Sequence, residues 1–172
     1  MLVCTTFGAT PSYSAPPVEL YRLLLEAQNG NKAADAKMLD CMTRLSDTLS
    51  RYHQRFRKFP ESASELEDFD ASAKLNKIKN PYLENELLAK ELPATSPQYV
   101  QYQLLPDYGL SRNGTEALAK RPPKSWTGAP GTITIMHNSE NLFAVRACGL
   151  AGKPITDHTT NSVIFVFREL SQ

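Results

Sequence analysis

The chain has 172 residues, of which 41% are hydrophobic and 22% are charged, and these values are ordinary for a folded protein. Its 19 basic and 18 acidic side chains leave a net charge of +1, which excludes a strong overall field toward nucleic acid, membranes or acidic partners. No run of about 18 apolar residues, as a membrane-spanning helix requires, occurs in the sequence. We expect a single domain over residues 1–172.

The first thirty residues predict a flexible start followed by a short helix. Residues 1–9 are apolar and no basic residue precedes them, which fits either the remainder of a clipped signal or anchor segment or a disordered start. The Pro-rich stretch up to residue 16 predicts a loop. Pro17 then opens a short helix, which we expect Asn29-Gly30-Asn31 to break.

The clearest pattern in the chain is an apolar stripe in steps of four and three residues. It predicts one face of a helix of about six turns, beginning near Ala33 or Ala34 and ending at Phe56. The stripe consists of Met38, Met42, Leu45, Leu49, Tyr52, Phe56 and Phe59. Because so long a stripe needs an apolar partner, we expect it to pack on a sheet. Residues 17–59 are therefore the predicted helical part.

Basic side chains gather where this helix is expected to end, at Arg51, Arg55, Arg57 and Lys58. They predict either an interaction site for phosphate or anionic headgroups, or a solvated helix end that complements the helix dipole. We keep Arg51, Arg55 and Arg57 as candidate interaction residues. With a net charge of +1, nucleic acid is not an expected partner.

Residues 60–98 predict a variable connection. Pro60 ends the helix, and Ser62-Ala63-Ser64-Glu65 has the pattern of a capping box for a brief second helix anchored by Leu66. Asn80-Pro81 indicates a turn, and Tyr82 to Leu92 a further short helix.

Residues 99–172 change from helical to strand periodicity. Alternation predicts strands at 99–104, 131–136 and 142–148, and the continuous apolar run 163–167 predicts a last one. Asn138 to Asn141 indicates a hairpin turn. The strands follow one another with short or moderate links, which predicts an antiparallel meander. The expected fold class is α+β, with the long helix on an antiparallel sheet of about three or four strands.

Three cysteines, Cys4, Cys41 and Cys148, allow two interpretations. A disulfide between Cys41 and Cys148 would join the long helix to a strand, whereas reduced thiols would act as small core residues. No C-x-x-C pair is present, so a zinc or thioredoxin-like site has no support.

No motif predicts catalysis. His53 is expected on the solvated face of the helix, and a metal site built from His137, His158 and Asp157 has no support from ligand spacing. We expect no enzyme and no cofactor. Trp126, in a long predicted loop, is either a binding anchor or a lid on the core. Asn113-Gly114-Thr115 is either a turn or a glycosylation acceptor.

One combination of features points to a known family. The long helix ends in spaced aromatic residues, then come Phe59-Pro60-Glu61-Ser62 and Glu65-Leu66, a turn at Asn80-Pro81-Tyr82 and C-terminal strands. Over residues 38–168 this order resembles the soluble part of type IV pilin-like proteins, including the pseudopilins of type II secretion systems.

The resemblance implies a non-enzymatic structural or assembly subunit of a pilus-like or secretion machine in the cell envelope, in a periplasmic or extracellular location. Its partners would be other protein subunits, and a membrane only if the full gene product carries an anchor upstream. The alternative is a small secreted or periplasmic module that binds a partner or ligand and has no filament role.

Overall fold

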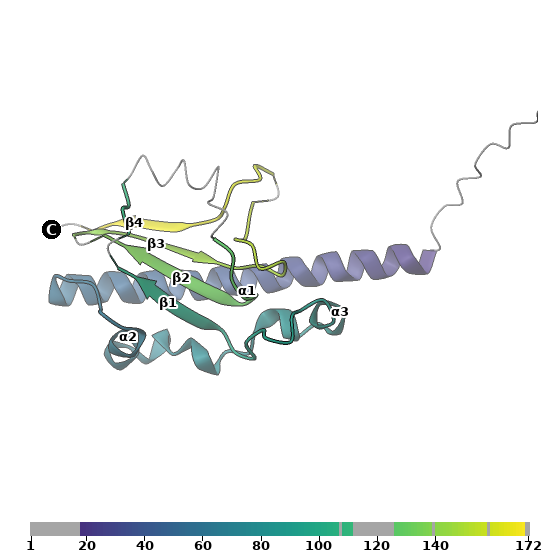
Figure 1. Ribbon diagram of the computed structural model, residues 1–172, viewed down its shortest axis with the longest axis horizontal. Helices are drawn as coiled ribbons and strands as arrows, with labels where there is room; N and C mark the ends of the chain where they lie inside the picture. Colours follow the sequence, from purple (N-terminus) through teal and green to yellow (C-terminus); the bar gives the residue numbers. More distant parts are fainter. Residues whose placement is uncertain (1–17, 107, 112–125, 139, 158, 171–172) are drawn as a thin grey trace, which may run out of the picture.

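The computed structural model describes residues 18–106, 108–111, 126–138, 140–157 and 159–170, with the backbone alone at 18–27 and 29. It confirms the α+β class, with a long helix lying on one face of a four-stranded sheet (Figure 1). The helices are α1 Val18–Phe56, α2 Ala63–Phe69 and α3 Glu86–Ala89, with single 3-10 turns at η1 Ala71–Ala73, η2 Leu75–Lys77 and η3 Pro81–Leu83. The strands are β1 Gln101–Leu105, β2 Thr132–His137, β3 Leu142–Ala147 and β4 Val166–Glu169.

The helix α1 is one continuous element of 39 residues, so the predicted break at Asn29-Gly30-Asn31 is wrong. A glycine inside a helix usually weakens it, but here the missing side chain makes room for a neighbour. A Cβ atom on Gly30 would lie 2.3 Å from Nδ2 of Asn85. Asn85 in turn caps α3, because its Oδ1 accepts the backbone N–H groups of Leu87 and Leu88. The glycine therefore serves close packing rather than termination.

The apolar stripe forms the core, as predicted, with one exception. Its members from Met38 to Tyr52 are at most 2% exposed, and Phe59 is 7% exposed. Phe56, in contrast, is 47% exposed. The reason is that α1 ends at Phe56 and Arg57 takes a left-handed backbone conformation, with φ of 57°. That turn redirects the chain, so Phe59 reaches the core from outside the helix.

The sheet is mixed, so the predicted antiparallel arrangement of residues 99–172 is partly wrong. Its order is β1-β2-β3-β4; β2, β3 and β4 pair antiparallel, but β1 pairs parallel to β2. A parallel pair needs a connection of roughly a dozen residues or more, and the chain between Leu105 and Thr132 is long enough. The last strand also begins later than predicted, because Val163 makes only an isolated bridge with Thr156.

The connection between α1 and the sheet contains the predicted capped helix but not the predicted helix from Tyr82 to Leu92. The side chain of Ser62 accepts the backbone N–H of Glu65 and caps α2, and Leu66 is fully buried. The Glu65 carboxylate accepts the N–H of Glu61, at 2.8 Å, rather than that of Ser62. The predicted helix from Tyr82 to Leu92 is wrong, because η3 and the four-residue α3 occupy this stretch instead.

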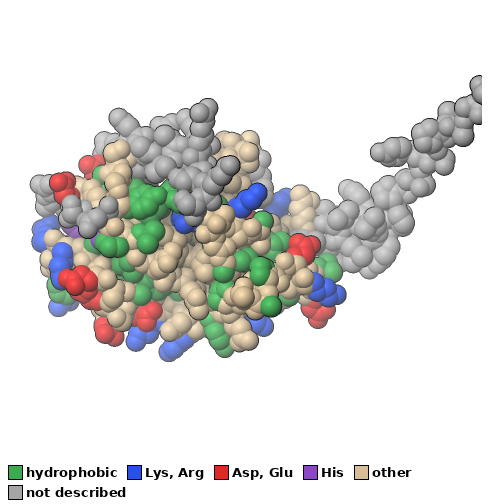
Figure 2. Space-filling model, in the orientation of Figure 1, with side chains coloured by type: hydrophobic (Ala, Val, Ile, Leu, Met, Phe, Trp, Pro, Cys, Tyr) green, Lys and Arg blue, Asp and Glu red, His purple; other side chains and the backbone are tan. Residues whose placement is uncertain are grey.

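Alternating sheet residues face two separate cores. Ile133, Ile135, Phe143 and Val145 belong to the core that α1 covers. On the opposite face a smaller core contains Leu110, Trp126, Met136 and Ala144. Figure 2 shows hydrophobic side chains of this face beside the residues drawn in grey. Arg146 of β3 is also buried on this face, against Trp126.

Candidate functional site

The four basic side chains at the end of α1 are all exposed, but two of them form ion pairs within the fold. Arg51 is bound, because its guanidinium forms an ion pair with Asp70 at 2.5 Å and a hydrogen bond with Oγ1 of Thr48 at 3.2 Å. Lys58 lies 3.5 Å from the carboxylate of Glu61. These contacts tie the end of α1 to the segment that follows it.

The remaining surface is a small patch formed by Arg55, Phe56 and Arg57, which we call the terminal patch. The guanidinium carbon of Arg55 lies 5.6 Å from the ring centroid of Phe56. The Phe56 ring rests on Tyr52 and Phe69, with centroids 4.7 and 5.8 Å away. All three members of the patch are exposed. An exposed aromatic ring between arginines is the composition that protein interfaces favour.

The ring beneath the patch is fixed by a polar contact. The hydroxyl of Tyr52 donates to Oε1 of Glu65, which joins α1 to α2. Burial, and then this hydrogen bond, raise the pKa of Tyr52. The bond from Tyr52, followed by the one from the Glu61 backbone, lowers the pKa of Glu65. The Tyr52 ring on which Phe56 packs is therefore joined to α2 by a hydrogen bond.

Trp126 is a lid on the second core and not an exposed anchor. It is 4% exposed, its indole N–H donates to the Tyr108 hydroxyl at 2.8 Å, and Phe165 packs edge-on at 5.4 Å. This is the second of the two alternatives that the sequence allows.

Two histidines are buried, although His53 was expected at the solvated face of the helix. His53 is 3% exposed and its Nε2 lies 3.0 Å from the carbonyl oxygen of Glu140, in the β2–β3 turn. His137 is 7% exposed, and the Phe59 ring lies between the two imidazoles, 4.8 and 4.6 Å from them. The prediction of an exposed His53 is wrong because the β2–β3 turn lies over this residue at the end of α1.

The structure settles the cysteine alternatives, whereas one residue of the suggested metal site lies outside the described residues. The residues that the structure describes contain no cluster of three His, Cys, Asp or Glu side chains able to hold a metal ion, and His158 lies outside them. Cys41 and Cys148 are buried free thiols, so of the two alternatives the structure has the reduced core thiols and not the disulfide. Burial raises the pKa of the Cys41 thiol, which makes it less reactive. Cys4 and Asn113-Gly114-Thr115 also lie outside the described residues.

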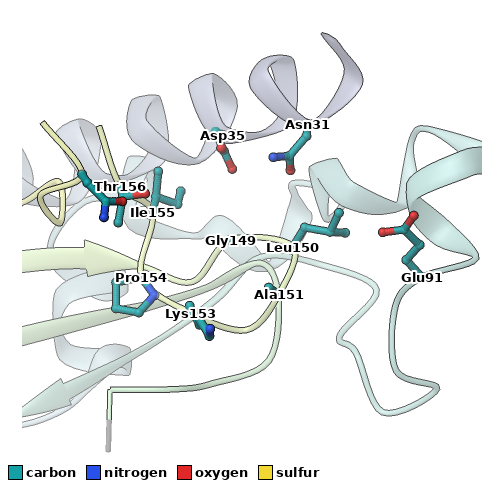
Figure 3. Close-up of a pocket in the computed structure, with 11 residues that line it drawn as sticks. Asn31, Asp35, Glu91, Gly149, Leu150, Ala151, Lys153, Pro154, Ile155 and Thr156 are labelled. Atoms are coloured by element: carbon teal, nitrogen blue, oxygen red, sulfur yellow. The ribbon is translucent and has the colours of Figure 1, made fainter. Parts of the chain in front are cut away.

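A recess of about 480 Å³ opens between α1 and the loop after β3 (Figure 3). Asn31 and Asp35 point into it from α1, and Glu91 and residues 149–151 and 153–156 form the opposite walls. The fully buried Tyr82 donates its hydroxyl proton to Oδ1 of Asp35 at 2.5 Å. Burial and the Asp35 carboxylate raise the pKa of Tyr82, so the phenol remains protonated and acts as a donor. The pair joins α1 to η3.

No sequence motif predicts this recess, because its walls come from three segments that lie far apart in the chain. Within the described part of the chain, no helix has both the length and the apolar character to cross a bilayer. Compared with models of protein families, with curated proteins and with solved structures, the chain gives no match.

Proposed function

We propose that this protein is a non-enzymatic structural subunit of a pilus-like or secretion machine in the cell envelope, and that its partners are other protein subunits. The observation that carries the proposal is the shape of α1. Its 39 residues span about 58 Å at 1.5 Å per residue. Figure 1 shows its N-terminal turns extending beyond the sheet and the short helices.

The two parts of α1 differ in their position relative to the sheet, which supports a role in assembly. From Ala34 to Tyr52 the stripe is buried against the sheet and the short helices, so this part belongs to the fold. The projecting turns contain Val18, Leu20, Leu23, Leu24 and Leu25 in sequence, a composition that an isolated surface helix rarely has. A second subunit would provide a partner for such a segment.

The terminal patch lies at the opposite end of α1 from the projecting turns. A contact between unlike ends of two copies repeats, and it builds a filament when the rotation between copies does not close into a ring, whereas a contact between like ends stops at a dimer. We infer that the terminal patch contacts a neighbouring copy. An envelope location, periplasmic or extracellular, belongs to the same proposal.

Photo-crosslinking tests this function. Benzoylphenylalanine replaces Phe56 in the full gene product, the cells are irradiated, and the adducts are identified by mass spectrometry. We expect adducts that contain a second copy of this chain, in a ladder beyond the dimer. The matched control is Tyr99, an aromatic side chain with 48% exposure that lies outside the terminal patch. Absence of self-adducts at Phe56, or equal yields at both positions, would refute the proposal.

The alternative, a ligand-binding module without a filament role, is favoured by the recess in Figure 3. Oδ1 of Asn31 is buried there without a described hydrogen-bond partner. A monomeric protein whose Asn31→Ala variant loses saturable binding of a small ligand would support this alternative.

A further inference from the structure

The walls of the recess beside α1 carry both apolar side chains and carboxylates. Leu150 and Ile155 supply apolar surface, and Asp35 and Glu91 supply carboxylates from opposite walls (Figure 3). Lys153 is the one basic side chain among the described residues that line the recess, so negative charge exceeds positive charge there. These walls suit an apolar group that is accompanied by positive charge.

The recess has room for an aromatic side chain. Its volume is about 480 Å³. An apolar cavity of about 150 Å³ is enough to hold a benzene molecule. Gly149 and Ala151, which have little or no side chain, form part of the wall in the loop after β3. A phenyl ring therefore fits with space left for polar groups beside it.

The terminal patch has the complementary composition. Phe56 is 47% exposed and stands between Arg55 and Arg57 in the chain. Neither arginine forms an ion pair with a described carboxylate. Arginine and carboxylate make strong, charge-assisted hydrogen bonds, and an aromatic side chain in a pocket is a common interface anchor. One ring and two guanidinium groups match one apolar recess with two carboxylates.

The terminal patch of a molecule cannot reach the recess of the same molecule. Asp35 and Phe56 belong to one continuous helix, α1. Their separation along the helix axis is about 30 Å at a rise of about 1.5 Å per residue. The patch that fills the recess must therefore come from a second copy. Because the two surfaces are unlike, the same contact can form again at the free surfaces of each added copy.

We propose that the recess of one copy receives the terminal patch of the next copy. The Phe56 ring enters between the apolar walls, and Arg55 and Arg57 lie beside the two carboxylates. The ring supplies the buried anchor, while the charged groups chiefly select the orientation, because exposed ion pairs contribute little affinity. This inference rests on the proposed assembly of copies and adds the surface on which the terminal patch docks.

Photo-crosslinking in the full gene product locates the docking surface. Benzoylphenylalanine at position 56 should give adducts with Glu91 or with residues 149–156 of a second copy. The same probe in place of Ala151, an exposed residue of the recess wall, should give adducts with residues 52–59. Self-adducts of the first probe at other surfaces would overturn this inference and leave the proposed assembly standing, whereas no self-adduct would refute both. Adducts of the Ala151 probe with another protein, and none with the terminal patch, would also overturn it.

An exchange of charges tests the pairing between patch and recess. Two tagged copies of the chain are co-expressed, and the probe at position 56 is placed in the first. Arg55→Glu together with Arg57→Glu in the first copy should lower the yield of adducts at least tenfold, because the carboxylates then repel one another. Glu91→Arg in the second copy should raise this yield again at least threefold. The matched control is Glu86→Arg, since Glu86 is exposed on α3 and does not line the recess. No recovery with Glu91→Arg, or equal recovery with both variants, would overturn the proposal.

A bulky side chain in the recess provides an independent test. Ala151→Trp in the second copy should fill the recess and lower the yield of adducts at position 56 at least tenfold, while the circular dichroism of the purified full chain stays unchanged. Asn76→Trp is the control, because Asn76 is exposed and does not line the recess. An unchanged yield in a folded Ala151→Trp variant would overturn the proposal, and the exchange of charges decides alone if this variant does not fold.

Discussion

Leu45 tests whether the α1 stripe is the core of the fold. Its side chain is 0% exposed and belongs to the main core cluster. Leu45→Ala removes three carbon atoms, at about 0.8 kcal/mol each, which gives about 2.4 kcal/mol of lost transfer free energy. The residual cavity adds to this, so we expect the free energy of unfolding to fall by about 3 kcal/mol. This is a large part of the roughly 5–15 kcal/mol that stabilises a domain.

Urea denaturation measures this loss, with circular dichroism as the probe and the midpoint compared at constant slope. Phe56→Ala is the matched control on the same helix, because Phe56 belongs to the predicted stripe but is 47% exposed. We expect it to cost about 1 kcal/mol or less. Equal losses in the two variants, or a loss below about 1 kcal/mol for Leu45→Ala, would refute the assignment of the stripe to the core.

Three further predictions concern glycine packing, a buried amide and alkaline pH. Gly30→Ala should destabilise the protein, because the new Cβ meets the Asn85 side chain. In an Asn85→Ala background the same substitution should instead stabilise the helix by about 1 kcal/mol. A double-mutant cycle in which the two unfolding free-energy changes simply add would contradict this. Asn80 is fully buried, and its amide group donates to two backbone carbonyl oxygens. Asn80→Asp should therefore lower the free energy of unfolding, measured by urea denaturation, by at least about 3 kcal/mol. A decrease below about 1 kcal/mol would contradict this role of the amide. The pKa of Tyr82 is raised in the folded protein. The protonated hydroxyl therefore contributes fully to the free energy of unfolding below the unfolded-state pKa of about 10, and this contribution is lost as the pH rises toward the folded-state pKa. Urea midpoints between about pH 9 and 11.5 should therefore fall less steeply in Tyr82→Phe than in the wild type, and parallel curves would exclude this origin.

The helix and the core stripe could be predicted because both are local properties of the sequence. The positions from Met38 to Tyr52 repeat over several turns, and burial follows directly from that repeat. The strand positions were also readable from alternation, but alternation carries no information about direction. The parallel pairing of β1 with β2 could therefore not be predicted from the alternation of apolar and polar residues.

The errors arise where a distant residue decides the local structure. Gly30 does not break α1 because Asn85, 55 positions later, fills the space beside it. His53 is buried because the β2–β3 turn supplies the carbonyl of Glu140. Arg146 in β3 is buried because the ring of Trp126, from another segment of the chain, packs against its guanidinium. None of these partners is indicated by spacing in the sequence.

The parallel pairing of β1 and β2 has a consequence for the order of folding. The β2–β3 hairpin closes over Asn138 to Asn141, so its ends meet at little entropic cost. β1 can pair only after the chain between Leu105 and Thr132 has placed β2 beside it in the same direction. Contacts of greater sequence separation form later on average. In refolding, amide protection should therefore appear in β2 and β3 before it appears in β1, which makes the parallel edge the last part of the sheet to become stable.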